Sequence, residues 1–389
     1  MKRAKLSSLL VFGLITLALL ASGLWAQTPE RFFDTAGAPA DRARLVIFYP
    51  SLGTVKDLVA LKDNGLFPAD KMEIVGVFHE KERTNYRQSI KFAADNNLTW
   101  LKFHQVSADI GPASLFKKNG CTPEFETIFK KSDGIIFFGG PDIPPTLYGQ
   151  KTNMFTGIDD PYRHYFELSA IFHLLGGSQN ASFKGLLESR PDFPILGICL
   201  GSQSLNVGTG GTLVQDIWSE VYGKKFFEDV VDLGQANWHT NPHRRLHPEI
   251  RNLLSYMLHP IQLNGKGKFC TELGFKPDDE PYIMSAHHQM ADKLGKGFRV
   301  AATSLDGKVT EAIEHERFPN VLGVQFHPEF SMLWTTEHNY RFTPQDKDLI
   351  AIKPYLENHP PSFEFHKKLW SWFTQKLVAS HQAGSKLHI

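Results

Sequence analysis

The chain has 389 residues, and its 42 lysines and arginines nearly balance its 41 aspartates and glutamates, giving a formal net charge of +1. Such a balance provides no basic surplus for nucleic acid, so we expect no nucleic-acid partner. The length would suit about two domains, but no linker rich in proline, glycine or serine and no repeat separates two halves. We therefore expect residues 27–389 to form one enlarged α/β domain.

The N-terminal segment has the layout of a secretory signal. Three basic residues precede an apolar core at residues 9–20, and small residues follow up to a predicted cleavage site after Ala26. Residues 1–26 are therefore expected to be a signal peptide, and the mature protein to be periplasmic or secreted. The alternative is an uncleaved anchor helix, because residues 6–29 carry no charge. Only in that case do we expect the membrane as a partner.

Short apolar runs alternate with stretches of helical period along the first half of the chain. The apolar runs begin near residues 44, 72, 98, 134 and 193, and the helical stretches cover 54–67, 84–97, 122–131 and 162–177. This alternation predicts a doubly wound, mostly parallel sheet with helices on both faces. Later runs predict shorter strands, some of them antiparallel, at 298–307, 309–316 and 320–327. Ligands of such sheets bind beyond the carboxyl ends of the strands.

The apolar run that begins at Phe193 leads directly into Cys199, and a helix start follows. A strand-turn-helix corner of this kind lifts the side chain above the sheet, and Gly197 and Gly201 would relieve crowding in the strained turn. Because the helix N-terminus favours a thiolate over a thiol, the pattern predicts a nucleophile at Cys199. The alternative is a buried cysteine that packs as a small apolar residue.

A cysteine nucleophile needs a base, and the base needs a group that orients it. His327 and Glu329 end the last apolar run two residues apart, a spacing that in extended chain points both side chains to the same side. We therefore predict Cys199, His327 and Glu329 as catalytic residues. For the oxyanion we predict two backbone N–H donors, Leu200 after the cysteine and Gly140 in the double-glycine turn of "FFGGPD".

The other two cysteines, Cys121 and Cys270, lie just before a predicted helix and in a loop-like stretch. In an exported protein two alternatives stay open for them, a disulfide bond between the two or separate thiols. In either case Cys199 is the cysteine that we expect to be kept free for chemistry.

Three histidines four residues apart, His239, His243 and His247, suggest a metal site on one face of a helix. Pro242 and Pro248 interrupt such a helix, and no cysteine or aspartate completes the ligand set. We therefore predict a histidine-rich surface loop at this position, and we expect neither a metal nor another cofactor.

These residues, in this order, resemble the class I glutamine amidotransferase superfamily. The motifs that carry the resemblance are "GICLGSQ" at 197–203 and "HPE" at 327–329. Other stretches resemble one branch more closely, the gamma-glutamyl-gamma-aminobutyrate hydrolase-like proteins of the C26 peptidases, and these are "DGIIFFGGPDIPPTLYG", "NVGTGGTLVQDI" and "SAHHQMADKLGKGFRVAATSLDGKVTEAIEH". The likeness covers residues 133–217 and 282–330, whereas 218–281 and 331–362 look expanded.

The resemblance implies a doubly wound fold and a mechanism in which Cys199 attacks the γ-carbonyl of a glutamyl amide. A thioester forms, His327 passes the thiol proton to the leaving amine, and water cleaves the thioester. The substrate would be a small γ-glutamyl compound. Gln203, in the first helical turn after the nucleophile, would either contact the glutamyl group or face solvent. The stretch "SAHHQ" implies further substrate-binding residues at Ser285, His287 and His288.

The sequence thus predicts an exported cysteine hydrolase of γ-glutamyl amides. One alternative is a glutamine amidotransferase subunit that passes ammonia to a synthase, although the chain shows no synthase domain. Another is a non-catalytic γ-glutamyl-binding protein on the same fold. The identity of the leaving amine and the oligomeric state stay open at this level.

Overall fold

A ten-stranded sheet runs through the centre of the structure, a computed structural model that describes residues 30–37, 41–337 and 339–386. Residues Arg31–Ile389 form one compact unit. The predicted signal peptide lies outside the described residues. In the part of the chain that is described, no helix is both long and apolar enough to span a bilayer.

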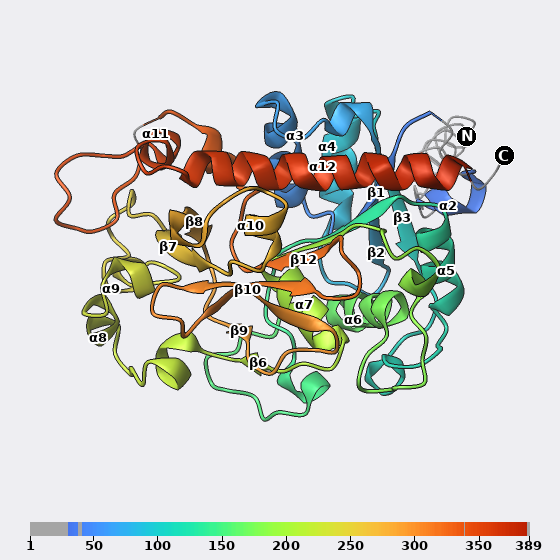
Figure 1. The fold of residues 1–389 in the computed structure, drawn as a ribbon, viewed down its shortest axis with the longest axis horizontal. Coiled ribbons are helices and arrows are strands. Elements are labelled where there is room, and N and C mark those ends of the chain that lie inside the picture. Colours follow the sequence, from blue (N-terminus) through green and yellow to red (C-terminus); the bar gives the residue numbers. More distant parts are fainter. Residues whose placement is uncertain (1–29, 38–40, 338, 387–389) are drawn as a thin grey trace, which may run out of the picture. The chain divides into compact units, whose positions relative to one another are not determined.

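The strands follow one another in the order β3-β2-β1-β4-β5-β12-β11-β10-β7-β8 (Figure 1). The first six in that order are parallel: β3 (Leu101–Val106), β2 (Glu73–His79), β1 (Arg44–Phe48), β4 (Gly134–Phe137), β5 (Ile195–Ile198) and β12 (Val321–Val324). The other four extend the sheet by antiparallel pairing: β11 (Thr310–His315), β10 (Phe298–Ser304), β7 (Met257–Leu263) and β8 (Tyr282–Ser285). A separate small sheet pairs β6 (Leu213–Val214) with β9 (Met290–Ala291).

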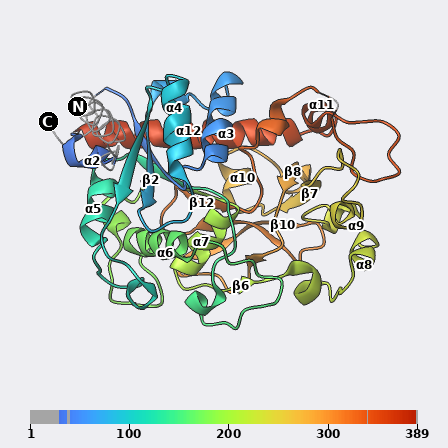
Figure 2. The same ribbon diagram turned by 180° about the vertical axis from the view of Figure 1, so that it is seen from behind.

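Helices cover both faces of the sheet, as the sequence predicts. Alternate residues of β1 point to opposite sides, so that Leu45 packs in one hydrophobic core and Val46 in the other. The first core is covered by α3 (Leu52–Asp63), α4 (Tyr86–Asp95) and the long α12 (Ser362–Lys386). The second core is covered by α5 (Thr122–Lys130), α6 (Pro161–Leu175) and α7 (Leu200–Gly208). Figure 2, the view from behind, shows α6 and α7 together, away from α12.

The remaining helices are short. They are α2 (Phe32–Thr35), α8 (Phe227–Val231), α9 (His243–Leu246), α10 (Lys268–Thr271) and α11 (Ile352–Glu357). Three of them, together with β7, belong to the expanded segment 218–281, for which the sequence predicted no elements. This segment therefore lengthens the sheet at its antiparallel end as well as adding loops.

Cys121 and Cys270 do not form a disulfide bond, because all three cysteines are free. Cys121 is buried in the second core, and Cys270 packs against the first, so the two lie on opposite faces of the sheet. Of the two alternatives that the sequence left open, the structure has the separate thiols.

Candidate active site

The corner at Cys199 is sharp because strand β5 ends at Ile198 and helix α7 begins at Leu200. Cys199 forms the turn with backbone angles φ 51° and ψ −107°. Residues other than glycine rarely adopt this backbone conformation. The corner needs small neighbours on both sides. A Cβ atom on Gly197 would lie 2.6 Å from the backbone of Gly201, and one on Gly201 would overlap the carbonyl of Phe137. These two glycines therefore let the corner close, as the sequence predicts.

His327 and Glu329 reach the same edge of the sheet from the neighbouring strand. Strands β5 and β12 are parallel and in register, with Ile198 opposite Val324, so both chains leave the sheet side by side. The Nδ1 atom of His327 lies 2.7 Å from Oε1 of Glu329. The imidazole of His327 and the Cβ atom of Cys199 both lie against Gly139, which places the two side chains next to each other. The structure therefore brings together the three residues that the sequence paired by their positions at strand ends.

The electrostatics of this trio favour a charged imidazole. Burial opposes a charge on His327, but the carboxylate of Glu329 and the sulfur of Cys199 outweigh it and raise the pKa of His327 to about 10. All three side chains are buried, between 4 and 6% exposed. On the outer side the ring of His327 stacks on Phe330, with 4.0 Å between centroids. The imidazole of His327 is therefore charged near neutral pH.

The backbone between His327 and Glu329 is held by the C-terminal helix. Trp370 of α12 is fully buried, and its Nε1–H donates a hydrogen bond of 3.0 Å to the carbonyl oxygen of Pro328. This contact joins residues 42 positions apart and fixes the turn from which both side chains project.

The double-glycine turn after β4 lies directly beside the trio. A Cβ atom on Gly139 would be 2.8 Å from Cε1 of His327, so only glycine leaves room for the imidazole. Within the part of the chain that the structure describes, neither the Gly140 N–H nor the Leu200 N–H donates to another protein group. Both predicted oxyanion donors are therefore available at the edge where Cys199 lies.

Arg163 holds this turn in place, a role that sequence reasoning missed. Its guanidinium donates to the carbonyl oxygens of Phe138 (2.7 Å) and Gly139 (3.1 Å), and it pairs with Glu167 at 2.8 Å inside the protein. A Cβ atom on Gly140 would overlap the guanidinium. Arg163 and Glu167 are four residues apart in α6, a spacing that places them on one helix face, but this spacing alone does not indicate that the pair is buried beneath the turn.

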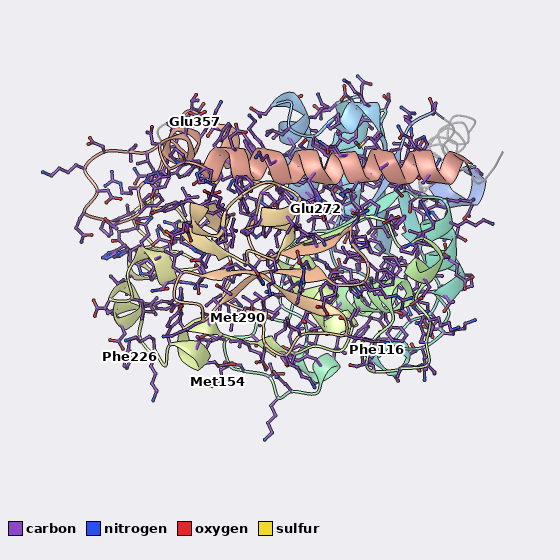
Figure 3. All side chains as sticks on the ribbon, in the orientation of Figure 1. Phe116, Met154, Phe226, Glu272, Met290 and Glu357 are labelled. Carbon is purple, nitrogen blue, oxygen red and sulfur yellow. The ribbon has the colours of Figure 1, made fainter. Side chains whose placement is uncertain are left out.

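One cavity lies beside the trio, and a larger one lies at the expanded segment. The smaller, about 240 Å³, is lined by Gly139, Gly140, His327 and Glu329, and by Tyr49 and Asp57 across from them. Burial and the nearby Glu329 charge raise the pKa of Asp57 to about 7. The larger cavity, about 340 Å³, is lined mainly by the expanded segment, including Lys224, Lys225, Phe226 and Arg245. Figure 3 labels Phe226 and Met154 at the lower edge of the view, and both side chains are exposed.

Three of the four residues predicted to bind substrate are buried. Gln203 is buried rather than solvent-facing, and its amide donates to the Gln289 carbonyl and the Gln325 side chain, each at 3.3 Å. Ser285 is fully buried at the end of β8. His287 is also buried, and its Nε2 atom faces a carboxylate, Glu311, at 3.4 Å, rather than the larger cavity.

Three residues of the stretch "SAHHQ" were predicted to bind substrate. Of these three, only His288 lines the larger cavity. Its Nε2 atom lies 3.0 Å from Asp142, and its Nδ1 atom lies 3.5 Å from Asp216. Burial opposes its charge, but the two carboxylates raise the pKa of His288 to about 9. Because Asp142 belongs to the turn that follows Gly140, His288 connects this turn to the wall of the cavity.

The prediction of a histidine-rich surface loop at 239–247 is wrong for two of its three histidines. His239 is fully buried and His243 nearly so, and only His247 has a partly exposed side chain. The prolines do break the helix, as expected, because α9 begins at His243 and contains four residues. His239 instead lies among three ligand-type side chains from distant parts of the chain, His259, His287 and Glu311.

A strained cysteine between a parallel strand and a helix, with a histidine and a glutamate at the end of the next strand, defines a protein of the class I glutamine amidotransferase-like type. The model of the Peptidase C26 family matches residues 73–329. The chain therefore belongs to the Peptidase C26 family, and this membership supports a hydrolase.

Two relatives illustrate the range of the family. A glutamine amidotransferase-like protein of Lactococcus lactis is 31% identical over 272 residues, which cover 69% of this chain and 94% of that protein. The gamma-glutamyl-gamma-aminobutyrate hydrolase of Escherichia coli K12 is 30% identical over 209 residues, which cover 53% of this chain and 67% of that protein. These matches confirm the superfamily and the branch that the motifs predicted.

Proposed function

We propose that the protein is an exported cysteine hydrolase that cleaves the γ-glutamyl amide bond of a small γ-glutamyl compound. The observation that carries this proposal is the position of Cys199, on its strained corner, beside the hydrogen-bonded His327–Glu329 pair. The name of the Escherichia coli relative supports the choice of bond. The layout of residues 1–26 supports export to the periplasm or the exterior.

The reaction begins with the thiol proton on His327, which the raised pKa of this residue favours. The sulfur of Cys199 attacks the γ-carbonyl carbon, and the oxyanion accepts hydrogen bonds from the Gly140 and Leu200 amides. The C–N bond breaks, the proton on His327 passes to the leaving amine, and a glutamyl thioester forms. Water, deprotonated by His327, then attacks the thioester, which releases glutamate and restores the thiol. Glu329 keeps the imidazole oriented and stabilises its charge.

The larger cavity is the proposed site for the part of the substrate beyond the scissile bond. Two lysines, an arginine and the charged His288 line it, together with aromatic side chains. The positive side chains could bind a carboxylate on the leaving amine, and the aromatic side chains could pack against its apolar part. This view makes the expanded segment the main determinant of the leaving amine.

Incubation of the mature chain with a panel of substrates tests the proposed function. The panel contains γ-glutamyl-γ-aminobutyrate, a folate polyglutamate, γ-glutamyl dipeptides and glutamine, and free glutamate is measured without any partner protein. We expect glutamate from at least one γ-glutamyl compound with a carboxylate on its leaving amine. Release only after a synthase is added would indicate an amidotransferase subunit. Binding without release would indicate a γ-glutamyl-binding protein.

Replacing His288 with glutamine is expected to raise KM for the best panel substrate about 10-fold, because a charged hydrogen-bonding group is worth about 1.5–3 kcal/mol. The effect should fall mainly on KM, since His288 lines the larger cavity and not the cavity that His327 and Glu329 line. Steady-state kinetics measures both constants. His247→Gln is the matched control, because His247 pairs with Glu249 on the surface. An unchanged KM in His288→Gln would rule out this role.

A further inference from the structure

Four ligand-type side chains converge in the interior, apart from the cysteine site. His239, His259, His287 and Glu311 are all buried, and one ligand atom from each lies within 4.8 Å of the others. They come from four separate places: the loop after residues 235–237, strand β7, the loop between β8 and β9, and strand β11. The expanded segment supplies two of the four. No residue of the trio takes part.

The distances suit a small cation. Oε1 of Glu311 lies 3.1 Å from Nδ1 of His239 and 3.7 Å from Nε2 of His259, and Oε2 lies 3.4 Å from Nε2 of His287. A zinc ion with bonds of about 2.0–2.1 Å in tetrahedral geometry holds its ligand atoms roughly 3.4 Å apart. The imidazole rings do not stack on one another. The plane of the His239 ring makes an angle of 82° with that of His259 and 47° with that of His287.

Backbone carbonyls fix the tautomers of two of the histidines. Nδ1 of His259 lies 3.1 Å from the carbonyl oxygen of Pro260, and Nδ1 of His287 lies 2.9 Å from that of Gln289. A carbonyl can only accept, so each Nδ1 carries the hydrogen and each neutral ring turns an Nε2 lone pair toward Glu311. Metal-binding histidines are oriented by outer hydrogen bonds of this kind.

Several polar atoms of the group have no hydrogen-bond partner in the part of the chain that the structure describes. Neither oxygen of Glu311 nor the Nε2 atoms of His259 and His287 have a hydrogen-bond partner among the described residues. Among the same residues, no lysine or arginine forms an ion pair with Glu311. A buried carboxylate that faces lone pairs is costly unless a cation lies between them.

We propose that His239, His259, His287 and Glu311 bind one divalent transition-metal ion, with zinc as the best fit to three imidazoles and a carboxylate. Four protein ligands complete a tetrahedral site, so its role is structural. The ion ties the expanded segment to the sheet and to His287, and His288, which lines the larger cavity, is the next residue. The site thereby fixes the wall of the cavity against the core.

The first test measures metal in the full-length mature chain after removal of any purification tag. After incubation with zinc and desalting, mass spectrometry of the elements should find about one zinc per chain. Removal of zinc with a chelator should lower the unfolding temperature, and zinc should restore it. Replacement with cobalt should give a visible spectrum of nitrogen and oxygen ligands without thiolate charge transfer. A folded wild type that retains less than about 0.1 zinc per chain and gives no cobalt spectrum would overturn the proposal.

Variants then locate the ion. Glu311→Gln keeps the shape of the side chain and should weaken zinc binding at least 10-fold, and His259→Gln should do the same. Cys199→Ala and His366→Gln should each keep one zinc, because neither residue belongs to the four proposed ligands. Both are buried, so they match the ligand variants in the disturbance of the interior. Wild-type affinity in a folded Glu311→Gln, or loss of zinc in Cys199→Ala, would overturn the assignment. If the Glu311 and His259 variants do not fold, the cobalt spectrum of the wild type decides.

Discussion

Glutamate release is expected to stop when Cys199 is replaced with alanine, with kcat falling by about 10⁴-fold or more. The reason is that neither of the other two cysteines is positioned to form the proposed thioester. Cys121 is buried in the second core, where burial raises its pKa to about 12, and Cys270 lies in α10, away from the carboxyl ends of the parallel strands. Neither can replace a nucleophile on the corner between β5 and α7.

The measurement is initial-rate kinetics combined with the intact mass of the protein. Wild type should carry a glutamyl adduct during turnover, and Cys199→Ala should not. Cys121→Ala is the matched control, since it also removes a buried thiol, and it should retain wild-type activity if it folds. Turnover by Cys199→Ala at the wild-type rate would refute the thioester mechanism.

Replacing Glu329 with glutamine is expected to lower kcat by about 10²–10⁴-fold, as loss of the orienting carboxylate does in comparable triads. The amide can still accept a hydrogen bond, but it no longer supplies the negative charge that raises the pKa of His327. The alkaline limb of the pH–rate profile should therefore move to lower pH in the variant. Glu249→Gln, on an exposed carboxylate paired with His247, should change neither quantity.

The same substitution should change how stability depends on pH. The pKa of His327 is about 10 in the folded protein and about 6.5 in an unfolded chain. A raised pKa stabilises the folded state fully below pH 6.5, and this contribution is lost as pH rises to 10. Urea unfolding at pH 6, 8 and 10 should show a steeper loss in wild type than in Glu329→Gln. Parallel losses in the two proteins would contradict the assigned charge on His327.

The part of the site that depends on local sequence could be predicted. Cys199 and His327 each follow an apolar run, and parallel strands place their carboxyl ends at one edge, so chain order was enough to pair them. Gly197 and Gly201 followed from the same corner. The parallel half of the sheet was predictable because its strands alternate with helices of clear period.

The parts that depend on long-range packing could not be predicted. The role of Arg163 arises only because α6 docks beneath the turn after β4. The antiparallel pairing of strands β7, β8, β10 and β11 brings His239 and His259 close to His287 and Glu311. The spacing of residues along the chain does not predict the register of these strands. The regular spacing of His239, His243 and His247 even suggested the wrong partners. In β7, a proline within the apolar run hid a strand from a reading by pattern.

The hydrogen bond from Trp370 to the carbonyl of Pro328 has a consequence for the order in which the protein is made. A ribosome synthesises the corner at Cys199 first, the turn with His327 and Glu329 next, and α12 last. Until the final helix has emerged and docked, the base and its carboxylate have no support behind them. A chain in which α12 has not yet docked therefore has Cys199 in place before the proposed proton acceptor is supported.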